Sequence, residues 1–532
     1  MARRSALEAA KNRAEIEQYR LDADLAREKR KQLKRLYEGA QSNQYYPKRG
    51  DRYSADAVVG AATHKIRAYA RYLDENHDLA IGVLDELQRR IVGCGITVEP
   101  MVKRPDGKLH EQINKRIRRL WIEWTDGFPE ASRTIPWPTT EALVCRSWLR
   151  DGEILIHHIE GAGAPIKHGS RIPYSLEIVE PDYLPFDLLR QKGEGNNRIV
   201  HGVELNDWKQ PIAYHLYKEH PGDTGIGLAS LQNFKDETKR VSAQEITHLK
   251  FARRFGQTRG VSLLHGVLRR LEDIKEYEES ERIAARVAAA FTAVIKKSAD
   301  FQGAVNLDAT TGRRSFEMAP GMIFDQLLPG EDVSTISSDR PNSALVGYRD
   351  AMLRAVASGT GTSHSSISRN YDGTYSSQRQ ELVEAEAGYE AFREHFVAMF
   401  RKPVYRRFID MAVMAGLLPM SGADRESIYD ADYIGMPIPW IDPLKEINAD
   451  ALAVQSGFKS RHMVIRERGY DPSTVDEQLA VDDFDVRPTE AKGEPSNGKS
   501  GNTDGNDSQG KDQEDAAGTN SGRAKGRRRD AA

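Results

Sequence analysis

The sequence predicts an α+β protein of more than one domain, built from helices and small antiparallel sheets. Apolar residues recur at helical spacing in several segments, whereas the stretch from about residue 151 to 249 consists of short β-favouring runs separated by Gly, Pro and Asn turns. The chain has 532 residues, and a single core seldom grows past about 250–300 residues. Two or three domains are therefore expected.

Composition and charge exclude several classes of protein. Hydrophobic residues make up 39% of the chain, and no apolar run approaches the roughly 20 residues that a membrane-spanning helix needs. The N-terminal residues are charged and lack the apolar core of a secretory signal, so we expect a protein that folds in a cytoplasm and has no membrane partner. The formal net charge of −2 argues against tight DNA binding over the whole surface, because such affinity comes from Lys and Arg neutralising phosphates.

The chain contains two cysteines, Cys94 and Cys145. This number rules out a disulfide framework and any cysteine-rich zinc site. We expect both to be small buried apolar residues rather than nucleophiles.

The first predicted elements are helical. Residues 6–38 are rich in Ala, Glu, Lys, Arg and Leu and contain no Pro or Gly, which predicts a long, exposed, charged helix. Two further helices are predicted between Ile66 and Ile91, where apolar residues fall at helical spacing. Gly93 and Gly95 then end the second of these helices.

Strands follow. Residues 153–159, 176–178 and 213–217 are rich in β-favouring side chains or alternate between apolar and polar. Because the strands are short and separated by turns, antiparallel pairing is expected.

Helical spacing returns from about Leu264 and continues towards Ala290 through a charged, Ala-rich stretch. Residues 291–295 predict a strand, and Pro-Gly turns bracket the apolar run 322–328, so small β elements are expected there. A helix over 344–357, a polar loop to about residue 377 and a long helix kinked or divided by Pro403 come next. Two short helical stretches follow Pro443.

The last segment, residues 487–532, contains no Val, Ile, Leu, Met, Phe, Tyr, Trp or Cys. No apolar burial offsets the entropy of ordering it, so a disordered tail is predicted. Residues 493–500, GEPSNGKS, satisfy the phosphate-loop pattern with Lys499 as its lysine. A working phosphate loop needs a buried strand before it and a helix after it, and neither flank has that character. We interpret the match as coincidental.

Other chemical signatures are equally weak. Ser363 and His364 are neighbours in a polar loop, but adjacent residues rarely supply the geometry of a Ser–His nucleophile, and no G-x-S-x-G elbow is present. His157 and His158 are successive residues of a predicted strand, so they point to opposite faces and cannot jointly bind a metal. We therefore expect no metal, no cofactor and no catalytic residues.

Several segments occur in a telling order: RAYARYLDENHDLAIGVLDELQRRIVGCGITVEP, DGEILIHH, LEIVEPDYL, IVHGVELNDWKQPIAYHLY, EITHLKFARRFGQTRGVSLLHGVLRRLEDIKEYEESERIAARVAAAFTAVIKK, LPGEDV through SISRNYDGTYSSQRQ, and WIDPLKEINADALAVQSGFKSRHMVIRERGYD. Together they resemble the lambda-type family of tailed-phage portal proteins. Gly93 and Gly95 match that family's Val-Gly-x-Gly-Ile turn, and His248, Arg259 and Gly260 match its passage into the first long helix. The joint occurrence of the segments over most of residues 50–485 makes the resemblance specific.

The resemblance implies an α+β portal-like fold with an α/β wing, long stem helices, a small β clip, a helical crown and a disordered C-terminal tail. The implied regions are, in chain order, a charged N-terminal helix (1–44), the wing (45–260), the first stem helix (261–290), the clip (291–340), the second stem helix (341–358), a candidate channel loop (359–380), a long helix returning to the wing and crown (381–420), a crown-like helical region (421–486) and the tail (487–532).

The same resemblance implies the function of a phage portal protein, which is not an enzyme. Such a protein forms a homododecameric ring at the unique capsid vertex, through which double-stranded DNA is packaged and ejected without sequence specificity. Its partners would be copies of itself, the terminase large subunit, major capsid and scaffold proteins and head-tail connector proteins, with assembly in the host bacterial cytoplasm and a final place in the virion. The candidate channel residues are Arg369, Asn370, Tyr371, Tyr375 and Arg379.

Two other hypotheses stay open on the sequence alone. One is a nucleic-acid-processing hydrolase or NTPase that uses the Ser363/His364 loop or residues 493–500. The other is a monomeric nucleic-acid-binding adaptor whose basic end, Lys525 to Arg529, does the binding.

Overall fold

The structure is a computed structural model that describes residues 17–25, 27, 53–190, 197–223, 238–289, 293–297, 331–335, 344–436 and 443–482. Contacts divide the chain into two units, residues 1–475 and 476–532. The sheets and cores belong to the first unit. No helix in these described ranges has the length and apolar character needed to span a bilayer.

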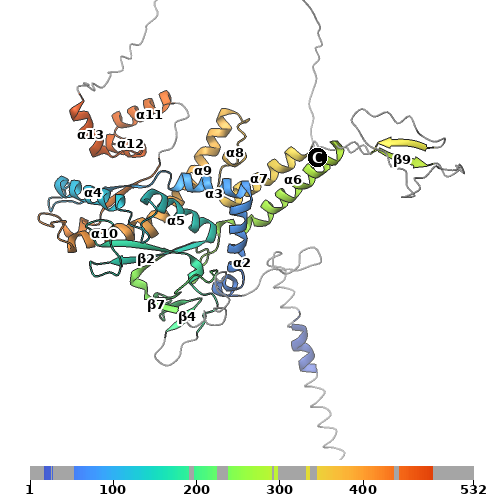
Figure 1. Ribbon diagram of the computed structural model, residues 1–532, viewed down its shortest axis with the longest axis horizontal. Helices are drawn as coiled ribbons and strands as arrows, with labels where there is room; N and C mark the ends of the chain where they lie inside the picture. The colour runs from blue at the N-terminus through green and yellow to red at the C-terminus, as the bar shows by residue number, and fades with distance from the viewer. Residues whose placement is uncertain are drawn as a thin grey trace, which may run out of the picture. The chain divides into compact units, whose positions relative to one another are not determined.

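The elements can be followed along the chain in Figure 1. Residues 17–25 are helical. The helices after them are α2 (Ala55–Asn76), α3 (Asp78–Ile91), α4 (Glu111–Asp126), α5 (Trp137–Asp151), α6 (Leu268–Ala289), α7 (Leu345–Thr360), α8 (His364–Ser368), α9 (Tyr375–Phe396), α10 (Lys402–Met414), α11 (Pro443–Gln455), α12 (Arg461–Glu467) and α13 (Pro472–Val481). The strands are β1 (Thr97–Pro100), β2 (Glu153–Glu160), β3 (Tyr174–Val179), β4 (Arg198–Val200), β5 (Val203–Leu205), β6 (Pro211–Tyr217), β7 (Thr238–Ser242), β8 (Ile246–Lys250), β9 (Ala293–Lys297), β10 (Glu331–Thr335) and β11 (Ala431–Ile434).

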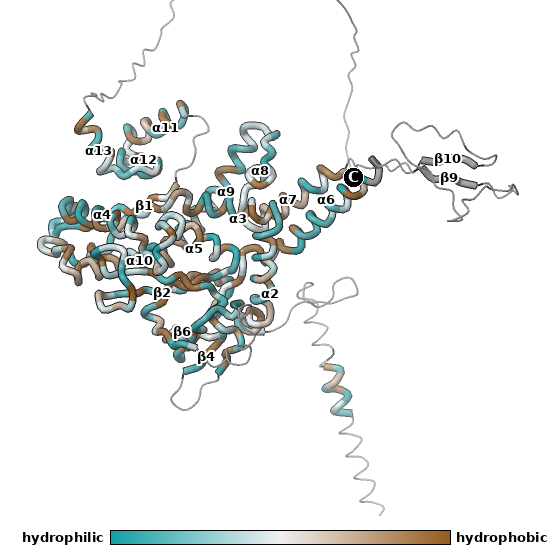
Figure 2. The backbone as a smooth tube through the Cα atoms, viewed as in Figure 1, coloured by the Kyte–Doolittle hydropathy of each residue, from teal (hydrophilic) through white to brown (hydrophobic). Residues whose placement is uncertain are grey.

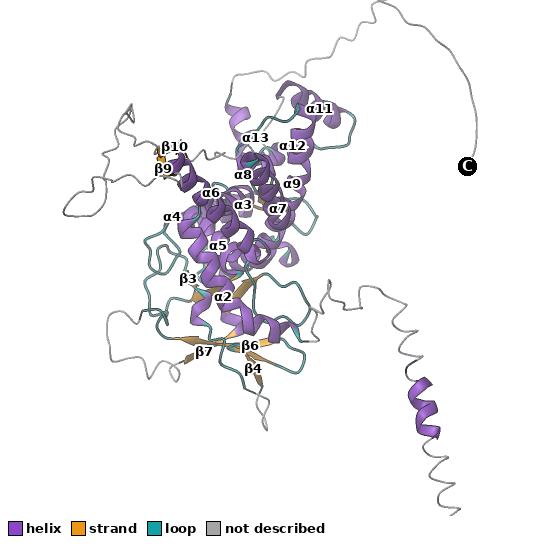
Figure 3. Cartoon of the chain, turned by 90° about the vertical axis from the view of Figure 1, so that its right-hand side faces the viewer, coloured by secondary structure: helices purple, strands orange, loops and turns teal. Residues whose placement is uncertain are grey.

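These strands form small sheets. One has the order β3-β2-β8, another is the meander β4-β5-β6-β7, and β1-β11 and β9-β10 are two-stranded. Every pair of these strands is antiparallel, with Leu155 of β2 opposite Val179 of β3 and Ile154 opposite Leu249 of β8. The predicted mixture of helices with short antiparallel strands is confirmed. Figure 3 shows β4, β6 and β7 together on one side of the helices.

Strand β2 separates two hydrophobic cores. Ile154 and Ile156 point into the larger core, whereas Leu155 belongs to the smaller one with Val203 and Tyr214. Successive side chains of a strand point to opposite faces, so a strand covered on both faces needs a continuous apolar run. The run Ile154-Leu155-Ile156 supplies it, and Figure 2 shows β2 as a hydrophobic segment.

Helices α4, α5 and α10 contribute aromatic side chains to the larger core. The Trp124 ring stacks on Tyr174 of β3 at 5.3 Å between centroids, and its Nε1–H donates to the Tyr174 carbonyl at 2.9 Å. The Trp121 ring meets Phe408 of α10 edge-on at 4.9 Å. No helix or strand is predicted between residues 96 and 151, yet α4 and α5 lie there.

Helices α2 and α3 confirm the predicted helix pair. Ser54 caps α2 by accepting a hydrogen bond from the Ala57 N–H at 3.2 Å. After α3 the chain turns at Gly93 (φ 60°) and Gly95 (φ 118°), both in the left-handed region that favours glycine. A Cβ on Gly93 would lie 2.9 Å from the Met436 sulfur. The expectation of two buried cysteines is half wrong, because this exposed turn carries Cys94 to the surface while Cys145 is buried in α5.

Helices α6 and α7 lie along each other, as Figure 1 shows. The Arg349 Nε lies 2.6 Å from a Glu278 carboxylate oxygen, and the Tyr277 and Tyr348 rings meet at 4.9 Å. Strand β9 begins two residues after the predicted start at residue 291 and pairs with β10.

The predicted loop over residues 359–377 is more helical than expected. The polar loop contains the short helix α8, and α9 already begins at Tyr375, so Tyr375 and Arg379 are helical rather than loop residues. A π-helical turn, Val397–Arg401, joins α9 to α10, and Pro403 lies in the first turn of α10, where a missing N–H is tolerated. The predicted division of the helix at Pro403 is thereby confirmed.

Several predicted features lie partly or wholly outside the described residues. They are most of the N-terminal helix, the clip range 291–340 apart from β9 and β10, the apolar run 322–328, the tail 487–532, the phosphate-loop match 493–500 with Lys499, and the basic end 525–529.

Candidate nucleic-acid interface

The segment from the end of α7 to the first turns of α9, here called the α7–α9 segment, carries all the candidate channel residues. Helix α7 ends at Thr360 and is capped by Gly361, whose φ of 74° is left-handed. The Ser363 side chain caps α8, which ends at Arg369 with a φ of 55°, and the Thr374 side chain caps α9. Each turn of the segment is therefore fixed by a local cap.

The carboxylate of Glu381, on α9, ties this segment to the start of α8. It accepts hydrogen bonds from the Ser363 hydroxyl at 2.6 Å and from the Ser365 backbone N–H at 2.9 Å. The Ser363 backbone N–H donates to the Tyr389 hydroxyl at 3.1 Å. Burial acts to raise the pKa of Glu381, but the hydrogen bonds from Ser363 and Ser365 outweigh it, so the pKa is lowered and the carboxylate stays charged.

The candidate channel residues are exposed on this fixed segment. Tyr371 and Tyr375 are 57% and 51% exposed, and Arg369, Asn370 and Arg379 are exposed too. The Arg379 guanidinium donates to the Tyr375 hydroxyl at 3.3 Å, which brings one cation and one ring together on the first turns of α9. Arg369 follows α8 instead, so the two arginines leave the segment from different elements.

A groove of about 950 Å³ borders the segment and is lined in part by Tyr371 and Arg379. Its other lining side chains include both basic and acidic groups, among them Arg90, Glu386 and Glu390. A groove of mixed charge binds a polyanion less tightly than a uniformly basic one, because fewer phosphates are neutralised.

Ser363 and His364 do not form a nucleophilic pair in this geometry. The Ser363 hydroxyl donates to Glu381 and lies 2.9 Å from the Ser365 hydroxyl, in the role of a helix cap. The His364 Nε2 lies 2.9 Å from a carboxylate oxygen of Asp350 on α7. A catalytic serine needs its hydroxyl hydrogen-bonded to the base, and here serine and histidine have different partners.

A second cluster brings His248, Arg259 and Gly260 together around the buried carboxylate of Glu153 on β2. The carboxylate oxygens lie 2.7 Å from an Arg259 guanidinium nitrogen, 2.7 Å from an Arg67 nitrogen and 3.0 Å from the His248 Nε2. The Gly260 backbone N–H donates to the same carboxylate at 2.7 Å. Burial acts to raise the pKa of Glu153, but the positive charge of Arg259 and the contacts with His248 and Arg67 hold it well below its usual range.

The Arg259 side chain also joins separate stretches of backbone. It donates to the carbonyls of Pro181 at 3.0 Å, Leu184 at 2.8 Å and His201 at 3.1 Å. Gly260 is required beside it by close packing, since a Cβ there would lie 2.1 Å from the Gly152 carbonyl oxygen. This cluster therefore fixes the end of α5, strand β2 and the loops near the four-stranded sheet to the chain that enters α6.

A family model described as "Phage portal protein, lambda family" matches residues 42–393. The chain belongs to this family. It is 23% identical over 451 residues to the probable portal protein of Halomonas phage phiHAP-1, with 83% of this chain and 84% of the relative covered. It is 22% identical over 300 residues to portal protein B of Escherichia phage lambda, with 51% and 55% covered. The portal protein of Escherichia phage N15 is 21% identical over 315 residues, with 54% and 58% covered.

Two solved structures similar to this portal protein are from gene transfer agent (GTA) particles. One is the neck of the native particle, computed with C12 symmetry, at 12% identity and a TM-score of 0.38, covering 77% of this chain and 94% of that one. The other is the virion of the native particle, at 12% identity and a TM-score of 0.41, covering 79% and 99%.

The matched range of this portal protein contains both the α7–α9 segment and the Glu153 cluster. Glu153, Arg67 and Glu381 are the residues that the sequence did not single out. One signal for Glu153 was available, since this carboxylate directly precedes the apolar run Ile154-Leu155-Ile156 of a predicted strand. A buried carboxylate needs a charged or hydrogen-bonding partner, so a cation from elsewhere in the chain is expected beside Glu153.

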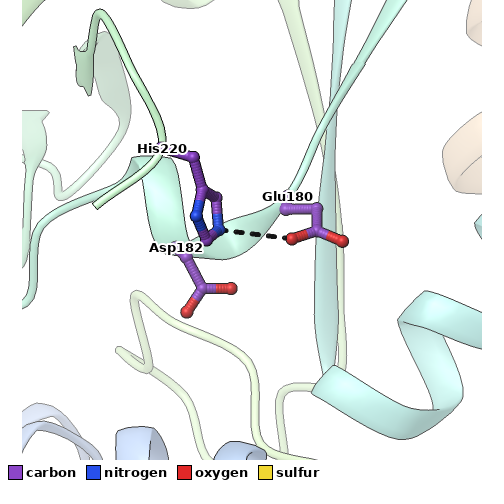
Figure 4. Close-up of side chains that lie close together, drawn as sticks. All are labelled: Glu180, Asp182 and His220. Atoms are coloured by element: carbon purple, nitrogen blue, oxygen red, sulfur yellow. Dashed lines mark ion pairs between the residues drawn. The ribbon is translucent and has the colours of Figure 1, made fainter. Parts of the chain in front are cut away.

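In the described part of the portal chain, one group of His and carboxylate side chains is close enough to hold a metal ion, namely Glu180, Asp182 and His220 (Figure 4). The guanidinium of Arg71 already lies 2.6 Å from an Asp182 oxygen and 3.7 Å from a Glu180 oxygen. The carboxylates are thus neutralised by protein, and the group is explained as an ion-pair network. The successive histidines of β2 have different partners: His157 contacts Glu177 and His158 contacts Tyr174.

Proposed function

We propose that the protein forms a ring at one vertex of a phage capsid and acts as the conduit for double-stranded DNA during packaging and ejection. The match to the lambda portal family over residues 42–393 is the observation that carries this proposal. A closed ring needs two different complementary surfaces on each subunit, since its interfaces are head to tail. We expect twelve subunits.

The regions implied by the resemblance are part of the proposal. The wing, residues 45–260, would contain both cores and the Glu153 cluster, and α6 and α7 would be the two stem helices of ranges 261–290 and 341–358. The antiparallel contact of β9 with β10 and the lengthwise contact of α6 with α7 support a clip joined to a stem. The range 381–420 would return to the wing, residues 421–486 would form the crown, and residues 1–44 and 487–532 would be a charged helix and a disordered tail.

The exposed α7–α9 segment would face the channel. Its arginines and tyrosines offer donors and flat surfaces to passing phosphates, and the caps and the Glu381 hydrogen bonds hold the segment in place. The channel must not bind moving DNA tightly, because each phosphate that it neutralises strengthens binding and slows the next step of DNA movement. A few arginines on a chain of net charge −2 meet that requirement.

The remaining partners follow from this role. The clip would dock the terminase large subunit, which hydrolyses ATP, and later the head-tail connector proteins. The wing would meet major capsid and scaffold proteins during assembly in the host cytoplasm, before the ring becomes part of the virion.

The test is the double variant Arg369→Ala with Arg379→Ala. Rings should still assemble by negative-stain microscopy, while the amount of DNase-protected DNA in packaged heads should fall, because two donors per subunit are lost from the channel. The matched control is Arg104→Ala with Arg119→Ala, which removes the same charge from exposed positions near α4. Normal packaging by assembled double-variant rings would remove the channel assignment.

A further inference from the structure

Two large aromatic side chains project almost completely into solvent. Trp208, in the turn between β5 and β6, is 86% exposed, and Phe255, in the loop after β8, is 108% exposed. Aromatic side chains displayed in this way are typical anchors of protein interfaces, where Trp and Arg carry much of the binding energy.

Both aromatic residues are carried on turns fixed by hydrogen bonds. The Asn206 side chain accepts from the Trp208 and Gln210 backbone N–H groups at 2.9 and 2.8 Å. The Gln257 side chain accepts from the Arg253 N–H at 3.0 Å and donates to the Phe251 carbonyl at 3.0 Å. Pre-organised anchors lose little entropy on binding.

The two turns meet, and their charge is positive. The Lys209 ammonium lies 3.3 Å from the position that a Cβ on Gly256 would occupy. Lys209 and Arg253 are exposed, and neither has an ion-pair partner in the described ranges. We call the set Trp208, Lys209, Arg253 and Phe255 the aromatic–basic patch.

A surface of opposite charge lies on α6. Asp273, Glu276 and Glu279 follow one another at three-residue spacing, are exposed, and have no ion-pair partner among the described side chains. Ile283, one turn further, is 53% exposed. Figure 2 shows α6 as largely hydrophilic. Like charges at this spacing repel along a helix, and the nearby basic side chains of Arg269, Arg270 and Arg282 form no ion pair with the row among the described residues, so the row can accept a cation from another molecule.

We propose that the aromatic–basic patch of one copy of this chain docks on the acidic row of α6 in the neighbouring copy. The inference rests on the proposed ring, whose head-to-tail contacts require two different, complementary surfaces on each subunit. Opposite charges on the two surfaces fix the register of the contact, and the aromatic side chains supply the apolar area beside Ile283.

A second copy fits the patch better than double-stranded DNA. Base-stacking aromatic residues serve single-stranded nucleic acid, because the base faces of a duplex are already stacked on each other. Because every chain carries both the aromatic–basic patch and the acidic row of α6, the two surfaces are always present at the same concentration.

Charge reversal provides the test. Lys209→Glu with Arg253→Glu should block ring formation by the full-length protein, as should Asp273→Lys with Glu276→Lys, measured by native mass spectrometry and negative-stain imaging. All four substitutions in one chain should restore rings, because the charges are again complementary. Rings formed by either double variant would overturn the inference. So would a quadruple variant that stays monomeric although its circular dichroism spectrum matches that of the wild type.

Truncation of the anchor gives an independent measurement. Trp208→Ala should raise the protein concentration for half-maximal ring formation about tenfold, as expected for loss of one interface anchor. The control Phe458→Ala removes an aromatic side chain that is 83% exposed elsewhere and should leave that concentration unchanged. Equal effects of the two variants would refute the docking role of Trp208. Loss of binding to a labelled single-stranded oligonucleotide by Trp208→Ala, with ring formation intact, would assign the patch to nucleic acid instead.

The outcome separates this inference from the proposed function. If the wild-type chain forms no rings under any assembly condition, the proposed function itself fails. If wild-type rings form and every patch variant assembles normally, the ring stands and only the docking surfaces are wrong.

Discussion

Replacing Arg259 by methionine tests whether the Glu153 cluster holds the two cores in place. The substitution keeps a long side chain but removes the contact with Glu153 at 2.7 Å and the donors to three backbone carbonyls. Both partners are fully buried, so the remaining carboxylate is left with less compensating charge. Breaking one side of a buried ion pair costs about 3–5 kcal/mol. That loss is a large part of the roughly 5–15 kcal/mol by which folded proteins are stable.

Urea unfolding of the full chain, followed by tryptophan fluorescence, measures the effect, since Trp124 and Trp148 are buried in the larger core. We expect the midpoint of the transition that exposes these residues to fall sharply for Arg259→Met. The control is Arg171→Ala, which removes an exposed arginine paired with Glu123 and should leave the midpoint unchanged. An Arg259→Met midpoint as close to wild type as that of the control would refute the reasoning.

The other predictions concern acid stability, close packing and the tail. Burial lowers the pKa of His158 to about 3, with a smaller effect from Arg407. The unfolded side chain titrates near pH 6.5, so the contribution of His158 to the free energy of unfolding should fall by up to about 1.4 kcal/mol per pH unit between about pH 6.5 and pH 3. His158→Gln should flatten this slope in urea titrations, and an unchanged slope would contradict the prediction. Gly260→Ala should cost about 1–3 kcal/mol by its clash with the Gly152 carbonyl, whereas Gly82→Ala, in open space within α3, should gain about 0.5–1 kcal/mol; equal thermal melts would count against both. Truncation after Val486 should leave rings intact by negative-stain imaging, and their loss would show that the tail is structural.

Much of the secondary structure could be predicted because it depends on local pattern. The helix pair ending before Gly93 carries a helical periodicity that the structure keeps, and the β-favouring run 153–159 forms β2. The helix predicted from about residue 264 is present too, although α6 begins at Leu268 after a 3-10 turn over Leu263–Gly266. Helix α4 carries the same kind of signal, because Ile113, Ile117 and Trp121 are buried on one face at helical spacing.

The loop assigned to residues 359–377 shows a different kind of error. A polar, Ser-rich stretch predicts irregular structure, yet the caps at Ser363 and Thr374 start helices within it. Serine and threonine favour both turns and helix starts, so their presence alone does not decide between the two. The distant Glu381 stabilises the first of these helix starts.

The sequence by itself determined the family and the mixed helix and strand content, because these depend on the order and spacing of neighbouring residues. Only the tertiary structure brought Glu153 to Arg67 and Arg259, which are separated from it by 86 and 106 positions in the chain. The physical reason is that a buried charge is stabilised by whichever cation the fold carries to it, and no local pattern encodes that meeting. The same holds for the turns that carry Trp208 and Phe255, because only the folded chain brings Lys209 of one turn close to Gly256 of the other.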